Sequence, residues 1–328
     1  MTIYAGLDIH KKKCHGVIME EDGEILEDEE FENSLLGVKE FFRGYKHAQV
    51  VIEASYSWRP TYERLEEMGL EVKLAHPHKV RAIAEAKIKT DSIDARTLAH
   101  LLRADLIPES YIPRKEIREL RDKTRLRAKL GNERTRMKCK IRAELEKNRI
   151  TTLKNPFTKS GKEKLREIEI DSVDHCLAIL DIIEERIGIL ENEFEEISRD
   201  NEEAKLLMTI PGISHFSALL ILSEIGDIDR FQSPEKLCSY AGVVPTVRQS
   251  GDSIRIGEIK KDSDKFLRWI LVECVWIHVG NADSQLSKYY RKKKREKDSK
   301  RAAIATAKKM LTAIYFMLKR EEEYHLEG

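Results

Sequence analysis

The sequence IYAGLDIH, residues 3–10, predicts a buried β-strand that carries one carboxylate. Apolar, β-prone residues fill Ile3–Ile9, as they do in a strand at the centre of a sheet. Asp8 interrupts them, and a carboxylate is costly to bury unless a cation or hydrogen-bond donors compensate its charge. This stretch therefore predicts the first strand of a sheet and a candidate functional position within it.

Four more strand-like runs follow within the first hundred residues. Gln49–Glu53, with the sequence QVVIE, is short, β-branched and bounded by polar residues, as a buried strand is. Three early strands, then strands that alternate with helices, predict an α/β domain with a mixed sheet and helices on its faces. The other strands are expected at Cys14–Met19, Ile25–Phe31 and Glu71–Ala75, and the helices at about 35–44, 57–68, 77–86 and 92–103.

The charges are sorted along the chain, although 59 basic and 58 acidic residues almost cancel. Lysine and arginine outnumber acidic residues by 15 to 6 in Tyr111–Ile150 and by 13 to 2 in Leu286–Arg320. Between these blocks, Lys162–Glu203 holds 15 acidic residues and 5 basic ones. Solvated helix faces explain any single block, whereas two separate basic blocks also indicate a polyanionic partner such as nucleic acid.

Several classes of protein are disfavoured by the sequence. No run approaches the roughly 18 apolar residues of a membrane span, and the first lysines follow the apolar segment, whereas those of a secretory signal precede it. The five cysteines are scattered and show no CxxC spacing, which argues against a disulfide framework and a zinc site. We therefore expect a cytoplasmic protein that has no membrane partner.

The middle of the chain predicts two long helices. The first, at about 114–149, is basic and free of proline, and Thr151–Gly161 breaks the pattern after it. The second helix carries an apolar heptad typical of a coiled-coil seam, which we expect to mediate self-association. An intramolecular hairpin with the basic helix is the alternative, and it would also neutralise opposite charges. The seam consists of Val173, Cys176, Leu180, Ile183, Ile187, Leu190, Phe194 and Ile197.

A mostly helical region is predicted after Lys205. The segment LLMTIPGISHFSALLILSEIG reads as two helices joined by a turn at Gly212, and further helices are expected at about 234–242, 262–279 and 299–320. Pro245–Gly257 is rich in serine and glycine and is expected to be a loop. A glycine turn that opens a helix offers free N–H groups to a phosphate, as in a helix-hairpin-helix, although an ordinary helix corner fits equally well.

Four carboxylates form the first candidate site. Asp8 lies in the first strand, Glu53 ends the QVVIE strand, and Asp91 and Asp94 share one face at the start of a helix. If the two strands are neighbours and the helix crosses their ends, these acids would hold one or two Mg²⁺ ions, or Mn²⁺ instead, for in-line attack on a phosphodiester. Alternatively, Asp91 is an N-cap, Asp94 a favourable first-turn charge and Glu53 a strand-end charge. Asp8 is the hardest to explain in this way.

Ser250 is a candidate nucleophile, because it precedes Gly251 in the expected loop. Arg248, Arg255 and Lys260 lie near it in the sequence and would balance phosphate charge. A Ser-Gly pair is otherwise an ordinary turn, and no His-Asp pair that could activate the serine is identifiable.

A basic run after Tyr289 and Tyr290 is a candidate nucleic-acid contact. Aromatic residues beside basic ones suit a nucleic-acid backbone with some base stacking, and a solvated tail is the alternative. The run consists of Arg291, Lys292, Lys293, Lys294 and Arg295.

Taken in order, the motifs GLDIHKKK, VIEAS, KTDSIDARTLA, IPGIS, EIGDIDRF, LCSYAGVVP and QSG closely resemble the DEDD-type transposases of the insertion-sequence 110 family. The resemblance spans nearly the whole chain. It implies a RuvC-like (RNase H-fold) domain at about 1–110, a basic helix and coiled coil at 111–203, and a C-terminal transposase domain with the serine at 204–328. By the same resemblance, the metal-binding tetrad is Asp8, Glu53, Asp91 and Asp94, and the nucleophilic serine is Ser250.

The resemblance also implies a reaction and its partners. Donor and target DNA would recombine through a covalent phosphoserine link, within homodimers or tetramers whose carboxylates and serine can come from different subunits. Characterised members of the family use a structured non-coding bridge RNA that pairs with both DNAs. The expected location is a prokaryotic cytoplasm, at the nucleoid during the reaction.

Two other functions remain open from the residues themselves. A RuvC-like nuclease or resolvase would use water as its nucleophile and would leave no covalent adduct on the protein. A non-catalytic nucleic-acid scaffold would bind tightly and with strong salt dependence, whatever happened to the carboxylates. Asp8 argues against the scaffold, because a binding protein has no evident need for an acid in a core strand.

Overall fold

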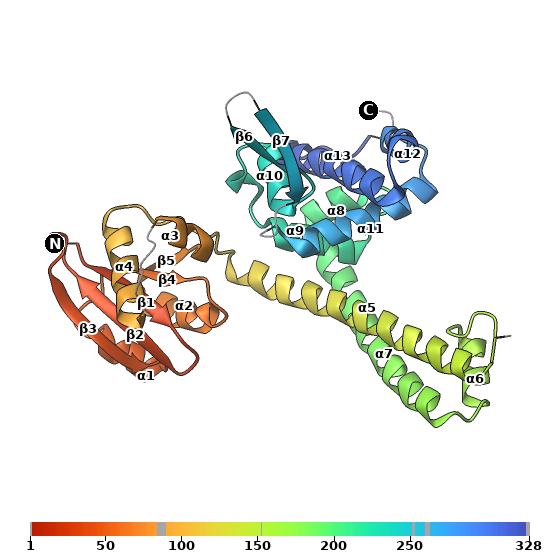
Figure 1. Cartoon of the computed structure of the whole chain (residues 1–328), viewed down its shortest axis with the longest axis horizontal. Helices are drawn as coiled ribbons and strands as arrows, with labels where there is room; N and C mark the ends of the chain where they lie inside the picture. The colour runs from red at the N-terminus through yellow and green to blue at the C-terminus, as the bar shows by residue number, and fades with distance from the viewer. Residues whose placement is uncertain (1, 84–89, 152, 251–252, 260–262, 326–328) are drawn as a thin grey trace. The chain divides into compact units, whose positions relative to one another are not determined.

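A computed structural model describes residues 2–83, 90–151, 153–250, 253–259 and 263–325 of the chain. The chain divides into two compact units, Met1–Ile112 and Pro113–Gly328 (Figure 1). Helices and a five-stranded sheet build the first unit, and helices with one two-stranded hairpin build the second. Among the described helices, none has the length and apolar character needed to cross a membrane.

The sheet of the first unit contains all five predicted strands. They are β1 (Tyr4–Ile9), β2 (Lys13–Met19), β3 (Ile25–Glu32), β4 (Gln49–Glu53) and β5 (Glu71–Ala75), in the order β3-β2-β1-β4-β5. β1 and β2 pair antiparallel, as do β2 and β3, whereas β4 pairs parallel with both β1 and β5. The predicted mixed α/β sheet is confirmed, and its topology is consistent with an RNase H-like domain.

Helices cover both faces of this sheet. The core on one face joins alternate β1 residues to α1 (Leu35–Phe41) and α2 (Trp58–Glu67). On the other face, α4 (Asp91–Arg103) packs against β1 and β2, and α3 (Pro77–Ile83) contributes Val80 beside it. Because side chains alternate along a strand, Ala5, Leu7 and Ile9 point to one face of β1 while Gly6 and Asp8 point to the other.

Gly6 permits the close approach of α4 to the sheet. A Cβ atom at this position would lie 2.2 Å from the carbonyl oxygen of Ala95 and 2.6 Å from the amide nitrogen of Ala99. Since both atoms are helix backbone, no rotamer change could relieve the clash. The absence of a side chain at Gly6 therefore sets the distance between α4 and β1.

The second unit begins with a helical hairpin and ends in a helical bundle. Its elements, in chain order, are α5 (Lys115–Lys147), α6 (Lys159–Arg166), α7 (Asp171–Arg199), α8 (Glu202–Met208), α9 (His215–Ile225), η1 (Ile228–Arg230), α10 (Pro234–Ala241), β6 (Pro245–Ser250), β7 (Ser253–Ile259), α11 (Lys265–Asn281), α12 (Gln285–Glu296) and α13 (Ser299–Arg320). Every residue of α9 from Phe216 to Ile225 is buried, so this helix forms the centre of the unit.

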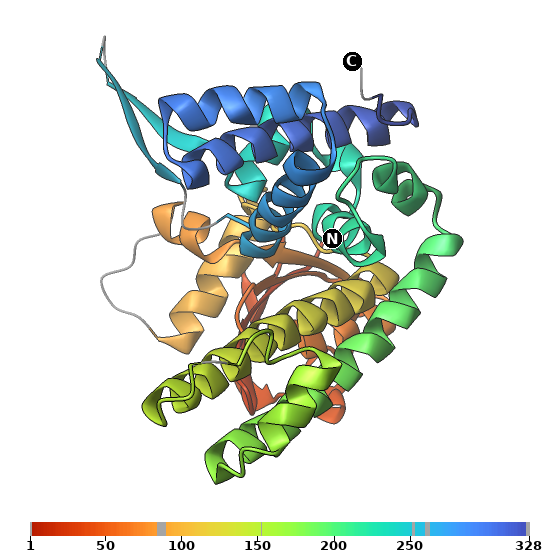
Figure 2. The ribbon, with the colours of Figure 1, turned by 90° about the vertical axis from the view of Figure 1, so that its right-hand side faces the viewer.

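The basic helix α5 and the acidic helix α7 pack against each other within one chain, and Figure 2 shows them side by side. Their apolar contacts include Ile141 on α5 and Val173 and Leu180 on α7. Ion pairs between described residues also cross this interface, among them Lys123–Glu193, Arg127–Glu191 and Lys138–Glu184. Much of the predicted seam is therefore used by the intramolecular hairpin, the alternative that the charge pattern also allowed.

Two local predictions from the sequence were wrong. Pro245–Gly257 was expected to be a loop, but it contributes β6 and most of β7, because β-branched residues occur on both sides of Gly251 and Asp252. Lys159–Arg166 forms α6, where Thr158 caps the helix by accepting a hydrogen bond from the Gly161 amide. The basic run lies in helix α12 and is mostly exposed, so the alternative of a solvated segment stays open.

A buried ion pair fastens α5 to α9. The Glu224 carboxylate is fully buried and accepts hydrogen bonds from Arg125 Nε at 2.6 Å and Nη2 at 2.7 Å, and Arg121 Nε lies 3.2 Å away. Removing Glu224 leaves Arg121, 16% exposed, without this carboxylate, whereas Arg125, 35% exposed, keeps Asp264 at 3.9 Å.

We expect Glu224→Ala to lower the free energy of unfolding by about 2–3 kcal/mol, as measured by urea titration. Glu273→Ala, a change of the same type on an exposed part of α11, is the control and should lower it by less than about 0.5 kcal/mol. Equal effects of the two variants would contradict a stabilising role for the pair.

Candidate functional site

Asp8 lies at the carboxyl end of β1 on the face covered by α4. Its side chain is 16% exposed, and Gly6, two residues earlier on the same face, contacts α4. Since Asp8 immediately follows Leu7, which pairs with Ile52, the parallel register places Glu53 beside it on β4. Residues opposite each other in register point to the same face. Both acids therefore lie at one edge of the sheet, beneath the same helix.

The first turn of α4 brings Asp91 and Asp94 to this edge. Thr90 is the N-cap, and its hydroxyl oxygen accepts a hydrogen bond from the Ile93 amide at 3.2 Å. The interpretation of Asp91 as an N-cap was therefore wrong, because Thr90 already satisfies the free amide. Asp91 is left with a carboxylate that is not needed to begin the helix.

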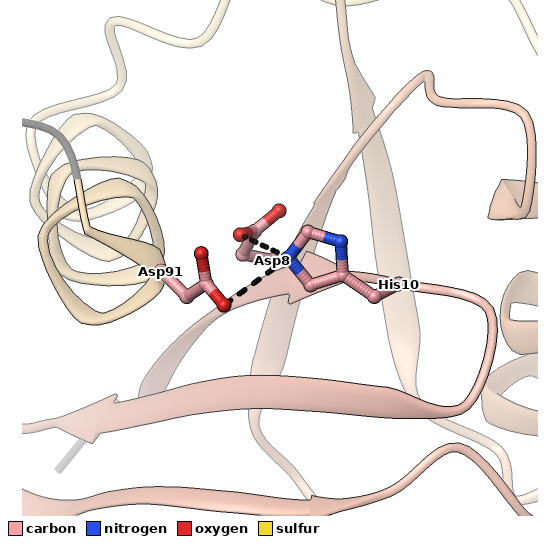
Figure 3. Close-up of side chains that lie close together, drawn as sticks. All are labelled: Asp8, His10 and Asp91. Atoms are coloured by element: carbon pink, nitrogen blue, oxygen red, sulfur yellow. Dashed lines mark ion pairs between the residues drawn. The ribbon is translucent and has the colours of Figure 1, made fainter.

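His10 joins Asp8 to Asp91 (Figure 3). Its Nε2 lies 3.2 Å from Asp8 Oδ2 and 3.2 Å from Asp91 Oδ2. The three residues form a group whose potential ligand atoms all lie within 4.8 Å of one another. Glu53 and Asp94 are not members of that group. The sequence prediction missed His10, and its position two residues after Asp8, on the same side of the chain, was the available signal.

The electrostatics of Asp8 favour a cation at this site. Burial raises the pKa of the Asp8 carboxyl, and the negative charges of Asp91 and Asp94 raise it further, whereas His10 lowers it. Asp94, three residues after Asp91 in the first turn of α4, adds to the negative charge that acts on Asp8. A bound divalent ion would offset this concentration of negative charge, and carboxylate oxygens are the ligands that hard cations prefer. The donor set therefore fits a divalent metal.

Asn33 holds the main chain of His10 in place. Asn33 Nδ2 donates a hydrogen bond to the His10 carbonyl at 2.8 Å, and the His10 amide donates to the Lys13 carbonyl at 2.9 Å. The amide oxygen of Asn33 in turn accepts from Thr61 Oγ1 at 3.0 Å and from Arg64 Nη1 at 2.7 Å. The turn between β1 and β2 is thus attached to α2.

Asp28 on β3 attaches the first turns of α4 to the sheet. Its carboxylate contacts His15 Nε2 at 2.7 Å, accepts from Ser92 Oγ at 3.1 Å and pairs with Arg96. Burial alone would raise the pKa of Asp28, but the hydrogen bonds from His15, Arg96 and Ser92 outweigh it and lower that pKa. Asp28 therefore stays ionised and orients the turn that carries Asp91.

We expect Asp28→Ala to weaken divalent-ion binding by about 10-fold, because partners of this kind orient the ligand residues. Isothermal titration with Mn²⁺ measures the effect. Glu40→Ala on the exposed side of α1 serves as a control and should leave the affinity unchanged. Unchanged affinity in Asp28→Ala would show that α4 holds its position without this contact.

Ser250 ends β6 and pairs in register with Ser253 on β7. The same register places Arg248 opposite Arg255, so two arginine positions meet along the hairpin that Figure 2 shows extending from the helices of its unit. The predicted contact Lys260 lies outside the described residues. The roles of Ser250, Arg248, Arg255 and Lys260 stay predictions.

Gly212 lies in the turn between α8 and α9, with a φ of +98° that favours glycine. A Cβ atom there would lie 2.8 Å from the His278 amide nitrogen on α11, so the turn is packed tightly against that helix. His278 Nδ1 also lies 2.8 Å from the Pro211 carbonyl oxygen. This packing explains the glycine, and phosphate binding by the turn stays a prediction.

The turn also borders a cavity of about 450 Å³. Gly212 and Ser214 line it together with Arg127, Arg134 and Trp269. These residues bring backbone, cationic and aromatic groups to one place on the second unit. Such a combination suits a sugar-phosphate chain.

The basic run on α12 is mostly exposed, but one of its two aromatic neighbours is not available. Tyr290 is 4% exposed, and its hydroxyl lies 2.8 Å from Ser299 Oγ. Tyr289 is partly exposed and lies beneath Lys293 and Lys309, at 5.9 and 4.7 Å from its ring centroid. Stacking of nucleic-acid bases on Tyr290 is therefore excluded in this arrangement. Arg291, Lys292, Lys294 and Arg295 are exposed, and Lys293 is partly exposed.

A mixed sheet with acids at the ends of its central parallel strands, β1 and β4, is the arrangement of an RNase H-like catalytic domain. Comparisons with protein families agree with it. A DEDD-type model of the IS110 group, described as "Transposase", matches residues 5–149, and a second model, "Transposase IS116/IS110/IS902 family", matches residues 204–291. The chain belongs to the IS110 family of transposases, and it is an enzyme of the DNA transposase class.

Individual relatives support this assignment. The chain is 27% identical over 295 residues to the "Putative transposase y4qE" of Sinorhizobium fredii, covering 88% of this chain and 75% of that protein. It is 25% identical to the "Transposase for insertion sequence element IS1111A" of Coxiella burnetii, over 84% of this chain and 79% of the relative. A "Pilin gene-inverting protein" of Moraxella bovis is 39% identical over 84 residues, which are 26% of this chain and 25% of that protein.

Proposed function

We propose that the chain is a divalent-metal-dependent, site-specific recombinase of an insertion sequence that cleaves and rejoins donor and target DNA. The observation that carries the proposal is the convergence of Asp8 and Asp91, 83 positions apart in the sequence, at one edge of the sheet beside Glu53. The N-cap of α4 is Thr90, so Asp91 is not needed to cap the helix. The match to the DEDD transposase family supports the same conclusion.

In the proposed site, Asp8, Glu53, Asp91 and Asp94 hold one or two Mg²⁺ ions. When bound, the metal supplies Lewis-acid polarisation of the scissile phosphate and stabilises the charge on the leaving oxygen. Asp8 and Glu53 are provided by the rigid sheet, while Asp91 and Asp94 are provided by a helix that Gly6 and Asp28 fix against it. This construction keeps the ligand residues in place before substrate arrives.

Ser250 is the proposed nucleophile. Its Oγ would form a bond to phosphorus as the bond to the 3′-oxygen breaks, which leaves a phosphoserine ester. The serine proton passes to solvent, and the leaving 3′-oxygen takes up a proton from solvent to become a free 3′-hydroxyl. Attack of another 3′-hydroxyl on that ester rejoins the DNA and restores the serine. Each exchange keeps the number of phosphodiester bonds, so no ATP is required. The arginine positions Arg248 and Arg255 on the same hairpin would balance phosphate charge.

The proposed domain organisation assigns the metal site to residues 1–110, the basic helix and coiled coil to 111–203, and the serine, the turn at Gly212 and the basic helix α12 to 204–328. Nucleic acid, including a non-coding bridge RNA, would contact the exposed basic residues of α12 and the cavity beside Gly212. Homodimers or tetramers would form through α7, whose Ile179, Ile182 and Ile189 remain 47%, 58% and 43% exposed in the single chain.

The proposal is tested by mixing the purified full-length protein with its co-purifying RNA, labelled donor and target DNA, and Mg²⁺. We expect a denaturant-resistant protein–DNA adduct that disappears when EDTA is added, and sequencing of the RNA should reveal segments complementary to both DNAs. Cleaved DNA without an adduct would favour the hydrolytic nuclease instead. Salt-sensitive binding without cleavage would favour the scaffold, provided that a relative of known activity cleaves its DNA under the same conditions.

A further inference from the structure

We infer that His10 is a third protein ligand of the metal held by Asp8 and Asp91, and that its nitrogen shifts the preference of the site from Mg²⁺ toward first-row transition ions such as Mn²⁺. This inference rests on the proposed metal site and goes beyond it, because the DEDD tetrad consists of oxygen ligands alone. Figure 3 shows the imidazole of His10 directed between the two carboxylates.

The distances between the ligand atoms fit one ion. Six ligands at about 2.1 Å from an octahedral ion place neighbouring ligand atoms about 3.0 Å apart. His10 Nε2 lies 3.2 Å from one oxygen of Asp8 and 3.2 Å from one oxygen of Asp91, so it is spaced as a neighbour of both. The whole group lies within 4.8 Å, which leaves room for an ion among the three atoms with only small side-chain movements.

His10 is also held where a ligand must be. It follows Asp8 by two residues, and both of its main-chain polar groups are hydrogen-bonded, to Lys13 and Asn33. The Asn33 amide oxygen has its own donors, Thr61 and Arg64, and Thr61 is fully buried. The β1–β2 turn is therefore fixed to the core of the unit, which holds the main chain of His10 beside Asp8 while its imidazole, 55% exposed, can turn to meet an ion.

A nitrogen ligand has a predictable effect on the choice of metal. Mg²⁺ strongly prefers oxygen ligands and keeps several water molecules, whereas imidazole suits transition ions, whose affinity for such a site rises along the first row from Mn²⁺. Replacing one water or oxygen by the His10 nitrogen therefore strengthens Mn²⁺ binding relative to Mg²⁺ binding.

Pulsed electron paramagnetic resonance of the full-length protein with Mn²⁺ alone tests the assignment. We expect a ¹⁴N coupling from one imidazole, replaced by a ¹⁵N coupling when the protein is grown with ¹⁵N-histidine. His10→Gln should remove the coupling and lower the ratio of Mn²⁺ to Mg²⁺ affinity by at least about 10-fold. His47→Gln, which changes an exposed histidine before β4, should alter neither quantity.

The outcomes separate this inference from the proposed function. If Mn²⁺ binds the wild type without nitrogen coupling, and Asp8→Asn lowers its affinity, the role of His10 is overturned. The carboxylate site is then left intact. Coupling that persists in His10→Gln would also overturn the role of His10, by assigning the nitrogen to another histidine. Mn²⁺ binding that neither Asp8→Asn nor Asp91→Asn weakens would overturn the metal site itself. The isotope measurement on the wild type does not depend on whether His10→Gln folds.

Discussion

Asp8→Asn is expected to lower DNA strand cleavage by at least about 10³-fold, because the lost metal ligand supplied several kcal/mol of transition-state stabilisation. The substitution keeps the size and shape of the side chain and removes the charge that holds the ion. Cleavage of labelled DNA, measured under single-turnover conditions with saturating Mg²⁺, gives the rate. Mn²⁺ titration of the same sample should show a parallel loss of affinity.

The same variant should be at least as stable as the wild type when no metal is present. Burial and the charges of Asp91 and Asp94 raise the pKa of Asp8 in the folded protein. The folded state therefore binds more protons than the unfolded state, and stability falls as the pH rises through the folded pKa of Asp8. Asparagine at this position removes that pH dependence. The free energy of unfolding of the variant near neutral pH should therefore equal or exceed that of the wild type.

Asp105→Asn is the matched control for Asp8→Asn. Asp105 has the same side chain in the same unit but is 95% exposed, and its φ of +53° is one that asparagine tolerates well. Its cleavage rate should remain within about twofold of the wild type, since surface substitutions of this kind have small effects. An Asp8→Asn protein that is folded, binds Mn²⁺ as before and cleaves normally would exclude Asp8 from the metal site.

Most strands of the first unit could be predicted because they are short runs of apolar and β-branched residues, whereas Ile25–Glu32 is acidic and could be predicted only as a partly exposed strand. Asp8 could be selected on the same basis, since nothing in an apolar strand compensates a carboxylate. The sequence could not show that Thr90 caps α4, because Thr90 and Asp91 are both good N-cap residues and only the fold shows which of them accepts the hydrogen bond. That ambiguity left the role of Asp91 open.

Other features depend on packing that no local pattern records. Gly6 reads as an ordinary strand glycine until the backbone of α4 is found 2.2 Å from the position of its absent Cβ. His10 follows a strand, and its contact with Asp91 requires a helix that begins 81 residues later. The heptad on α7 indicates a helical partner without identifying it, and the packing of Val173 and Leu180 with Ile141 of α5 shows that part of the seam is filled within the chain.

Ser250→Ala is expected to abolish the covalent protein–DNA adduct, since an alanine methyl group cannot replace the attacking oxygen. The yield of adduct should fall by more than about 10³-fold. Residual attack by water would not restore it, because hydrolysis produces cleaved DNA without a protein attached. The measurement is a denaturing gel of labelled DNA after incubation with protein, RNA and Mg²⁺, followed by protease digestion to identify the modified peptide. Metal affinity should be unchanged, since the four carboxylates are untouched.

Ser253→Ala is a stringent control, because Ser253 lies in the same hairpin as Ser250. Ser253 pairs with Ser250 in the β6–β7 register, so the two variants remove the same hydroxyl group from directly opposed positions of one hairpin. A general loss of hairpin stability would reduce adduct formation in both variants, whereas loss of the nucleophile would affect only Ser250→Ala. Adducts that persist in Ser250→Ala and vanish in Ser253→Ala would move the nucleophile to the opposite strand. Adducts that persist in both would show that the covalent chemistry belongs to another residue.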